Sequence, residues 1–391
     1  MMGSRASIEV LVVGAGIAGL TLARSLLARG AAVTVLDDGG PPASATPVGA
    51  LMPLPRAPAD DMLAALQTDG LSAMPALTAT LEAETGVTVG YRVTGRLTPL
   101  SDAAAVPEDA SLAEAAVRFE TIAAAQRAAG HALPGDGPLL QHLAPDALPP
   151  RLVAPEAAVG GALCDAVTAR LDTRALLRAL RLSVARHPAG RRLDAWPVRR
   201  IVPAPGRGGR AAVIGPLGRL PGDAVVLAAG WRSAAFAEHL GALPGRAVKG
   251  QAAFLAVALP PGTPVVQAPG LFVVPQTPGS DGTPRVGVGS TREPGRTDLS
   301  TDEGLDGMLD RTATLVPALR GAPVLEAWAG IRPRPPGRLP QAGPLPDRPG
   351  LWLLTGGHGI GIALAPALAE RLAEALMADA ELPGPLLPRR R

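Results

Sequence analysis

The feature that most constrains this chain is a glycine-rich turn between an apolar run and a helical segment near the N-terminus. Ile8–Val13 leads into Gly14-Ala15-Gly16-Ile17-Ala18-Gly19. This order is typical of a dinucleotide-binding β-α-β unit. We expect Gly14 to form the tight turn, Gly16 to let the backbone approach a pyrophosphate, and Gly19 to let the helix pack on the strand.

Two carboxyl groups follow the next predicted strand. Val33–Leu36 leads directly into Asp37 and Asp38. In units of this kind, the acid at the end of the second strand accepts hydrogen bonds from ribose hydroxyls. The prediction depends on the two strands, because a chain with 47 glycines could contain the spacing of Gly14, Gly16 and Gly19 by chance.

Length and composition predict a folded protein of more than one domain. The chain has 391 residues, of which 47% are hydrophobic and 18% charged. The formal net charge is only +3, so we expect no nucleic-acid partner. The single cysteine, Cys164, excludes an internal disulfide and a dithiol redox pair, and favours a cytoplasmic location. No apolar run is long enough to predict a membrane span, and we expect no bound metal.

Helical spacing and β-branched runs give a coarse map of the middle of the chain. We predict helices over 60–86 and 107–130 and a further helix over 171–180. We predict strands over 91–100, 198–202, 211–214 and 223–230.

A second glycine-rich turn lies near the C-terminus. Leu351–Leu354 reads as a strand, Thr355-Gly356-Gly357-His358-Gly359-Ile360-Gly361 as a turn, and the chain from about Leu364 as a helix. The free N–H groups and positive end of such a helix would stabilise negative charge on a cofactor. Chance could explain one glycine-rich turn of this kind more readily than two at opposite ends of one chain, so the pair favours dinucleotide binding.

Further motifs follow in a fixed order between these turns. They are Gly49-Ala50-Leu51-Met52-Pro53, Leu171–Leu180, Val225–Gly230, Val248-Lys249-Gly250-Gln251, Gly287–Thr291 and Ala329-Gly330-Ile331-Arg332-Pro333. Over nearly the whole chain, this order resembles the FAD-dependent oxidoreductases of the D-amino acid oxidase superfamily. Within it, the glycine oxidases of thiamine biosynthesis are the most similar group.

The resemblance implies an α/β fold with two domains. A Rossmann-like FAD-binding domain of the glutathione-reductase type would carry an inserted α+β substrate domain with a mixed or antiparallel sheet. We expect the FAD-binding domain at 5–85, 155–240 and 327–382, the substrate domain at 86–154 and 241–326, and a flexible tail at 383–391.

The resemblance also implies an activity. Such enzymes oxidise the C–N bond of a small amino acid or secondary amine, such as glycine, sarcosine or a D-amino acid, by hydride transfer to flavin N5. The imine product hydrolyses, and O2 reoxidises the flavin to give H2O2. FAD is expected to be non-covalent, because Cys164 does not match the late cysteine that attaches flavin in sarcosine oxidases. The resemblance leaves the oligomeric state open, with a homo-oligomer as one alternative.

Three residues are candidates for the substrate site. The family's carboxylate-binding arginine falls on Arg332, whose planar fork can hold a carboxylate through two hydrogen bonds. Phe272 stands where glycine oxidase has a tyrosine, so a hydroxyl is missing. Met52 either faces the flavin or fills the core. Lys249 is expected to be structural rather than catalytic.

Five segments and Arg332 are expected to contact the cofactor, and His358 either touches the flavin or only shapes its turn. The residues are Gly14, Ala15, Gly16, Ile17, Ala18 and Gly19; Asp37 and Asp38; Gly49, Ala50, Leu51 and Met52; Ala229, Gly230 and Trp231; Arg332; and Gly357, His358, Gly359, Ile360 and Gly361.

Other functions remain open at this point. A D-amino acid dehydrogenase that passes electrons to a quinone would share the fold. A flavin-binding protein without turnover, or with a different amine substrate, would explain the missing tyrosine hydroxyl. A flavin hydroxylase is disfavoured, because no Gly-Asp-Ala-type motif precedes the last helix.

Overall fold

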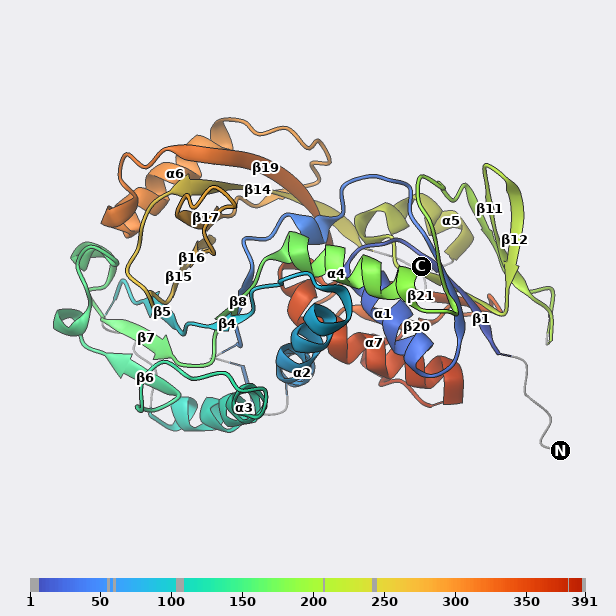
Figure 1. Cartoon of the computed structure of the whole chain (residues 1–391), viewed down its shortest axis with the longest axis horizontal. Coiled ribbons are helices and arrows are strands. Elements are labelled where there is room, and N and C mark those ends of the chain that lie inside the picture. The colour runs from blue at the N-terminus through green and yellow to red at the C-terminus, as the bar shows by residue number, and fades with distance from the viewer. Residues whose placement is uncertain are drawn as a thin grey trace.

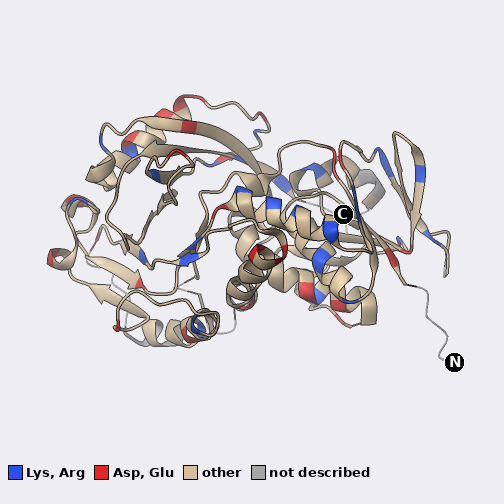
Figure 2. Ribbon diagram, viewed as in Figure 1, with Lys and Arg blue, Asp and Glu red and all other residues tan. Residues whose placement is uncertain are grey.

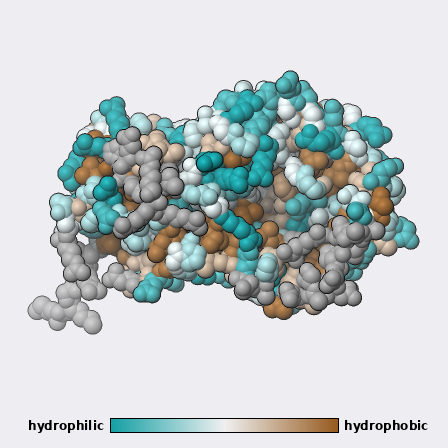
Figure 3. Space-filling view, turned by 180° about the vertical axis from the view of Figure 1, so that it is seen from behind, coloured by the Kyte–Doolittle hydropathy of each residue, from teal (hydrophilic) through white to brown (hydrophobic). Residues whose placement is uncertain are grey.

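The protein forms two lobes, each built on its own β-sheet (Figure 1). The computed structural model describes residues 7–54, 57–58, 61–102, 109–206, 208–240, 245–378 and 380–388. Acidic and basic residues are interspersed over both lobes (Figure 2). Figure 3 shows the molecule from behind, where hydrophilic and apolar residues both lie at the surface.

The first lobe contains a six-stranded sheet in the order β20-β21-β13-β1-β2-β9. The strands are β1 (Glu9–Val13), β2 (Ala32–Leu36), β9 (Gly190–Leu193), β13 (Ala224–Leu227), β20 (Gln341–Pro344) and β21 (Leu351–Thr355). All neighbours pair in parallel except β20 and β21. Val10 and Val12 of β1 pack in one core cluster and Leu11 and Val13 in another. Both faces of the sheet are therefore buried, which explains the continuous apolar run.

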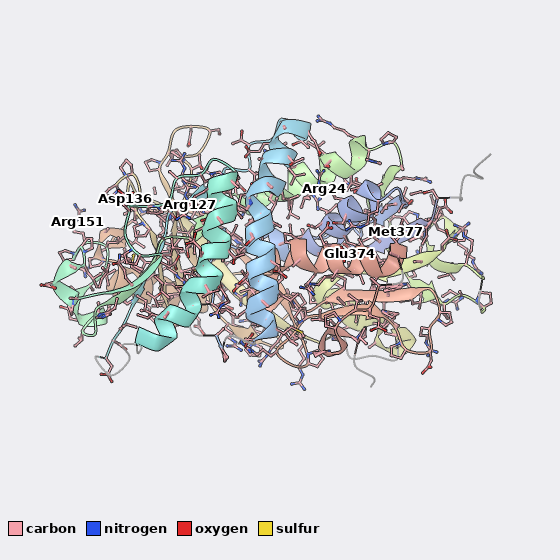
Figure 4. All side chains as sticks on the ribbon, turned by 90° about the horizontal axis from the view of Figure 1, so that it is seen from below. Arg24, Arg127, Asp136, Arg151, Glu374 and Met377 are labelled. Carbon is pink, nitrogen blue, oxygen red and sulfur yellow. The ribbon has the colours of Figure 1, made fainter. Side chains whose placement is uncertain are left out.

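Helices cover one face of this sheet and a small sheet covers the other. The helices are α1 (Ile17–Ala28), α2 (Met62–Thr85), α4 (Thr173–Arg186) and α7 (Gly361–Ala378), and the small sheet holds β10 (Arg200–Val202), β11 (Ala211–Gly215) and β12 (Gly218–Gly222), with α5 (Ala237–Leu240) beside it. Asp172 caps α4 by accepting from the Arg174 and Ala175 amides. Arg29, which caps the C-terminus of α1, pairs with Glu370 (2.6 Å) and Glu374 (3.6 Å) of α7, and Figure 4 labels Glu374.

The second lobe contains a nine-stranded mixed sheet. Its strands are β5 (Arg96–Pro99), β6 (Leu140–Leu143), β7 (Ala162–Asp165), β14 (Arg246–Ala256), β15 (Val265–Ala268), β16 (Leu271–Pro275), β17 (Arg285–Gly289), β18 (Glu293–Pro294) and β19 (Val324–Arg334). The order is β18-β14-β17-β16-β15-β5-β7-β6, with β19 on the other edge of β14. Among these pairs, β15 and β5 run parallel and the others antiparallel.

Two helices, a small sheet and several short helical turns complete the fold. They are α3 (Asp109–Ala128), α6 (Glu303–Leu315), the strands β3 (Ala50–Leu51), β4 (Arg92–Val93) and β8 (Ala169–Arg170), and the 3-10 turns η1 (Ala43–Ala45), η3 (Pro145–Ala147), η4 (Pro155–Ala157), η5 (Gly230–Phe236), η6 (Pro317–Leu319), η7 (His358–Ile360) and η8 (Gly384–Leu386). Helices α2 and α3 lie side by side (Figure 4). None of the described helices is long and apolar enough to cross a membrane.

The α/β fold class predicted from the sequence is confirmed. Helices α2, α3 and α4 confirm the helices predicted over 60–86, 107–130 and 171–180 within the described residues, and residues 60, 107 and 108 lie outside these. The strand predicted over 91–100 is split, because Gly95 takes a φ of 68° and separates β4 from β5. The last helix begins at Gly361, earlier than predicted.

Three predicted segment boundaries differ from what the sheets and the core show. Strand β7 lies within 155–240 and most of β19 within 327–382, but both belong to the sheet of the second lobe. In the predicted flexible tail, Leu386 is fully buried in the core of the first lobe, because η8 turns this leucine onto β20. Residues 389–391 lie outside the described residues.

Candidate active site

A cavity of about 750 Å³ lies where the two lobes meet, with walls from both large sheets. Its volume is within the range of about 300–1,000 Å³ that is usual for ligand pockets. One end is formed by turns at the carboxyl ends of the parallel strands, and we call it the glycine end. The other end is formed by strands of the nine-stranded sheet, and we call it the guanidinium end.

At the glycine end, the first turn has the geometry that its three glycines predict. Gly14 has a φ of +116°, and a Cβ there would lie 2.5 Å from the Ala228 carbonyl oxygen. A Cβ on Gly19 would overlap the Gly14 carbonyl oxygen, so helix α1 can pack only on a glycine. A Cβ on Gly16 would meet nothing closer than Ser44 Oγ at 3.5 Å, so this backbone borders open space. A phosphate could approach the N-terminus of α1 here.

The two acids after β2 line the cavity beside this turn. Asp37 lies 3.5 Å from the Arg181 guanidinium, and its carboxylate accepts from the Gly39 amide at 3.2 Å. Asp38 lies 3.4 Å from Arg232, whose guanidinium also sits 5.0 Å from the Trp231 ring centre. Both carboxylates are thus anchored within reach of a ligand in the cavity.

The second turn, from Gly356 to Gly361, reaches the cavity at the N-terminus of α7. His358 has a φ of 44°, and its Nε2 atom is buried with no hydrogen-bond partner. Burial lowers the pKa of His358 to about 4, and Arg332, Arg292 and Arg334 act in the same direction. The imidazole is therefore neutral near pH 7 and leaves one polar atom for a ligand. The open backbone at Gly16, the helix N-termini and this orphaned atom fit a bound dinucleotide.

Of the residues predicted to contact the cofactor, all but Gly19 and Leu51 line this cavity. Gly19 serves the packing of α1 on the strand. Leu51 is only 2% exposed and packs in the core, so it does not line the cavity, and its contact with the cofactor stays a prediction. The reason is strand alternation, since Ala50 and Met52 face the cavity while Leu51 points the opposite way.

Arg332, Phe272 and Met52 all line the cavity, and Phe272 and Met52 pack against the same apolar cluster. Arg332 Nη1 donates to the Thr291 carbonyl oxygen at 3.1 Å, and Nη2 donates to Ser290 Oγ. No carboxylate of the described residues lies within ion-pair distance of it. Burial lowers the pKa of Arg332, as does the charge of Arg292, while the charge of Glu293 acts in the opposite direction. An anionic ligand would relieve both effects.

Gly250 makes room for this guanidinium. It faces Gly330 across the β14–β19 pair, and a Cβ on Gly250 would overlap the Arg332 guanidinium. The Lys-Gly-Gln motif and the arginine motif, about eighty residues apart in the sequence, therefore form one local structure.

Sequence reasoning missed a buried polar network behind this end. Arg96 Nε donates to Asp165 at 2.7 Å, with side-chain exposures of 4% and 1%, and Arg96 also donates to Gln267 Oε1 at 2.7 Å. Asp165 further accepts from the Thr168 amide at 2.7 Å. Arg96 and Gln267 both line the cavity. No motif signals them, because the three side chains come together only through strand pairing.

Ser44 and Arg292 also line the cavity, although the sequence did not predict them there. The Ile17 amide donates to Ser44 Oγ at 3.0 Å, which fixes the start of α1. Arg292 directly follows the Gly287–Thr291 motif, so its position in the chain was the available signal.

Lys249 and Cys164 do not line the cavity. Lys249 is fully buried, with Nζ 2.5 Å from Asp298, which agrees with a structural role. Cys164 lies on β7, where burial and Asp165 raise the pKa of its thiol to about 11. The described residues contain no cluster of three or more His, Cys, Asp or Glu side chains that could hold a metal.

Comparison with known proteins gives a match over nearly the whole chain. The model of a family described as "FAD dependent oxidoreductase" matches residues 9–375. A glycine oxidase from Pseudomonas putida is 30% identical over 374 residues, which cover 94% of this chain and 94% of that protein. A glycine oxidase from Pseudomonas aeruginosa is 36% identical over a shorter stretch, which covers 40% of this chain and 42% of that protein.

Solved structures show the same fold. The crystal structure of glycine oxidase from Geobacillus kaustophilus has a TM-score of 0.79 at 24% identity and covers 98% of this chain and 100% of its own. The crystal structure of an iminodiacetate oxidase from Chelativorans sp. BNC1 has a TM-score of 0.74 at 24% identity and covers 97% and 98%, respectively.

Proposed function

Since this chain belongs to the family of FAD-dependent oxidoreductases, we propose that it oxidises the C–N bond of a small amino acid or secondary amine that carries a carboxylate. Its cofactor is FAD. Glycine, sarcosine and D-amino acids are the candidate substrates, and O2 is the proposed final electron acceptor, with H2O2 as its product.

The glycine end would hold the cofactor. The amides at the start of α1 would face the pyrophosphate, and Asp37 would accept from ribose hydroxyls. The Gly356–Gly361 turn, with the N-terminus of α7 behind it, would stabilise negative charge on the isoalloxazine. The neutral imidazole of His358 would offer Nε2 to the same group. None of these roles needs a covalent link, and no cysteine is among the residues that line the cavity.

Bound FAD supplies the electron sink that takes the substrate's α-hydrogen as hydride. The chain's own contribution is to orient the amine. Arg332 would hold the carboxylate through two parallel N–H···O bonds, which fixes the α-carbon relative to the glycine end. The nitrogen loses a proton as the α-carbon loses hydride, and water hydrolyses the resulting imine.

The observation that carries the proposal is the Arg332 guanidinium. It is partly buried in the cavity wall without an ion-paired carboxylate among the described residues, and its strand β19 contacts the turn at His358. An arginine kept for structure alone would be expected to have an acidic partner in such a place.

The test is anaerobic mixing of the purified flavoprotein with glycine, sarcosine, proline and a panel of D-amino acids, followed by admission of air. Bleaching of the flavin absorbance by one compound identifies the substrate. Recovery of the absorbance in air with production of H2O2 supports the oxidase, whereas a flavin that stays reduced indicates a dehydrogenase. If FAD is bound and no compound bleaches it, the proposal is wrong.

A further inference from the structure

The guanidinium end of the cavity contains a second arginine. Arg292 lines the cavity and its side chain is exposed, which places it at the rim. The peptide that joins Thr291 to Arg292 provides the carbonyl oxygen that accepts from Arg332 Nη1. The two guanidinium groups therefore belong to one short stretch of cavity wall, one at depth and one at the mouth.

The acids near this stretch are already engaged elsewhere. Glu293 accepts from Gln251 Nε2 at 2.9 Å and from Arg296 at 2.8 Å. Asp298 pairs with Lys249 at 2.5 Å, and Asp302 pairs with Arg296 at 2.6 Å. This cluster fixes the segment that follows Arg292. The charge of Glu293 acts on Arg332, but none of these described acids forms an ion pair with Arg332 or Arg292.

The acids that line the cavity do not neutralise these arginines either. Among the described lining residues, Asp37 and Asp38 are the acidic ones, and both lie at the glycine end, paired with Arg181 and Arg232. The cavity is thus asymmetric in charge: its guanidinium end has two cationic groups without an acidic partner in the described chain. One carboxylate can occupy one guanidinium fork, so the second fork is available for another anion.

We propose that Arg332 and Arg292 each bind one carboxylate of a dicarboxylic amine. Arg332 would hold the carboxylate next to the reacting α-carbon, and Arg292 would hold the distal one at the rim. Amino dicarboxylates and N-carboxymethyl amino acids have this chemistry. The inference rests on the proposed function, because it names the substrate class for the same cavity.

The neighbouring contacts favour this division of roles. Phe272, beside Gly289 in the sheet, has no hydroxyl to donate to a carboxylate. Among the described residues that line this wall, Arg292 is therefore the only charged one at the rim. Because Arg292 is exposed, salt should weaken its contact more than that of the partly buried Arg332.

The test measures binding by flavin absorbance, independently of turnover. The holoenzyme is titrated with succinate and propionate, which have no amine to oxidise. We expect succinate to bind about fivefold to tenfold more tightly than propionate at low ionic strength. Arg292→Gln should reduce this preference to nearly none, whereas Arg332→Gln should weaken the binding of both acids. Arg334→Gln removes the same charge from an exposed residue on the strand of Arg332 that does not line the cavity, and should preserve the preference.

Anaerobic reduction by iminodiacetate, D-aspartate, sarcosine and D-alanine separates this inference from the proposed function. If succinate is preferred in an Arg292-dependent way but no amine reduces the flavin, the two-carboxylate site stands and the oxidation does not. If sarcosine reduces the flavin but succinate is not preferred, the oxidation stands and the inference is wrong. Equal weakening of succinate and propionate by Arg292→Gln would also overturn it, because both arginines would then hold a single carboxylate.

Discussion

The two ends of the cavity are built by different means. The glycine end is a backbone structure, in which turns after parallel strands expose amides where side chains would collide. The guanidinium end is a side-chain structure, in which arginines from separate strands are held by buried pairs and by a neighbouring glycine. Changes at the glycine end should therefore affect folding and FAD retention. Changes at the second should affect substrate binding or the stability of one lobe.

The largest expected effect comes from Gly19→Val at the glycine end. Its side chain would collide with the Gly14 carbonyl oxygen and push α1 off the sheet. We expect a loss of about 3 kcal/mol or more in unfolding free energy and little bound flavin. Flavin absorbance after purification and urea unfolding measure this. Gly384→Ala is the control, because a Cβ there meets nothing within 4 Å. Normal flavin content in Gly19→Val would contradict the geometry.

Next in size is Asp165→Ala behind the guanidinium end. Removing this acid leaves the buried Arg96 without its partner, which should lower the free energy of unfolding by about 3–5 kcal/mol. Urea unfolding gives the value. Asp136→Ala, at an exposed acid labelled in Figure 4, should change it by less than about 0.5 kcal/mol. A small effect of Asp165→Ala would mean that Arg96 does not depend on this partner.

A smaller effect is expected from Gly250→Ala. The added methyl would displace the Arg332 guanidinium without removing it, so KM for a carboxylate substrate should rise about tenfold while FAD stays bound. Steady-state kinetics and flavin content measure the two quantities. If KM does not change, Arg332 either keeps its place or does not contact the substrate.

A pH dependence of stability is expected from His358. The unfolded histidine has a pKa of about 6.5, and the folded one is lowered to about 4 by burial and nearby arginines. The unfolded state therefore binds the proton first, so stability is complete above pH 6.5 and is lost as the pH falls towards 4. Thermal unfolding of the wild type should lose more between about pH 7 and pH 5 than that of His358→Gln. Parallel curves would show that His358 is not the group responsible.

The same contrast explains how much could be predicted from the sequence. The glycine end was predictable because its residues lie in short local motifs, as in Gly14 to Gly19. The core position of Leu51 could not be predicted, because the motif gives the segment but not which residues of a short strand face the cavity. Arg96, Asp165 and Gln267 could not be predicted, because β5, β7 and β15 meet only in the folded sheet.

The most direct test of the account compares sarcosine with dimethylamine, the same amine without its carboxylate, in anaerobic mixing with the wild type and with Arg332→Gln. We predict that sarcosine bleaches the wild-type flavin and dimethylamine does not. Arg332→Gln should retain FAD but need about 100-fold more sarcosine, as expected for a lost charge-assisted contact of about 2.7 kcal/mol. Equal bleaching by the two amines, or an unchanged sarcosine requirement in Arg332→Gln, would contradict the claim that this arginine binds the substrate carboxylate.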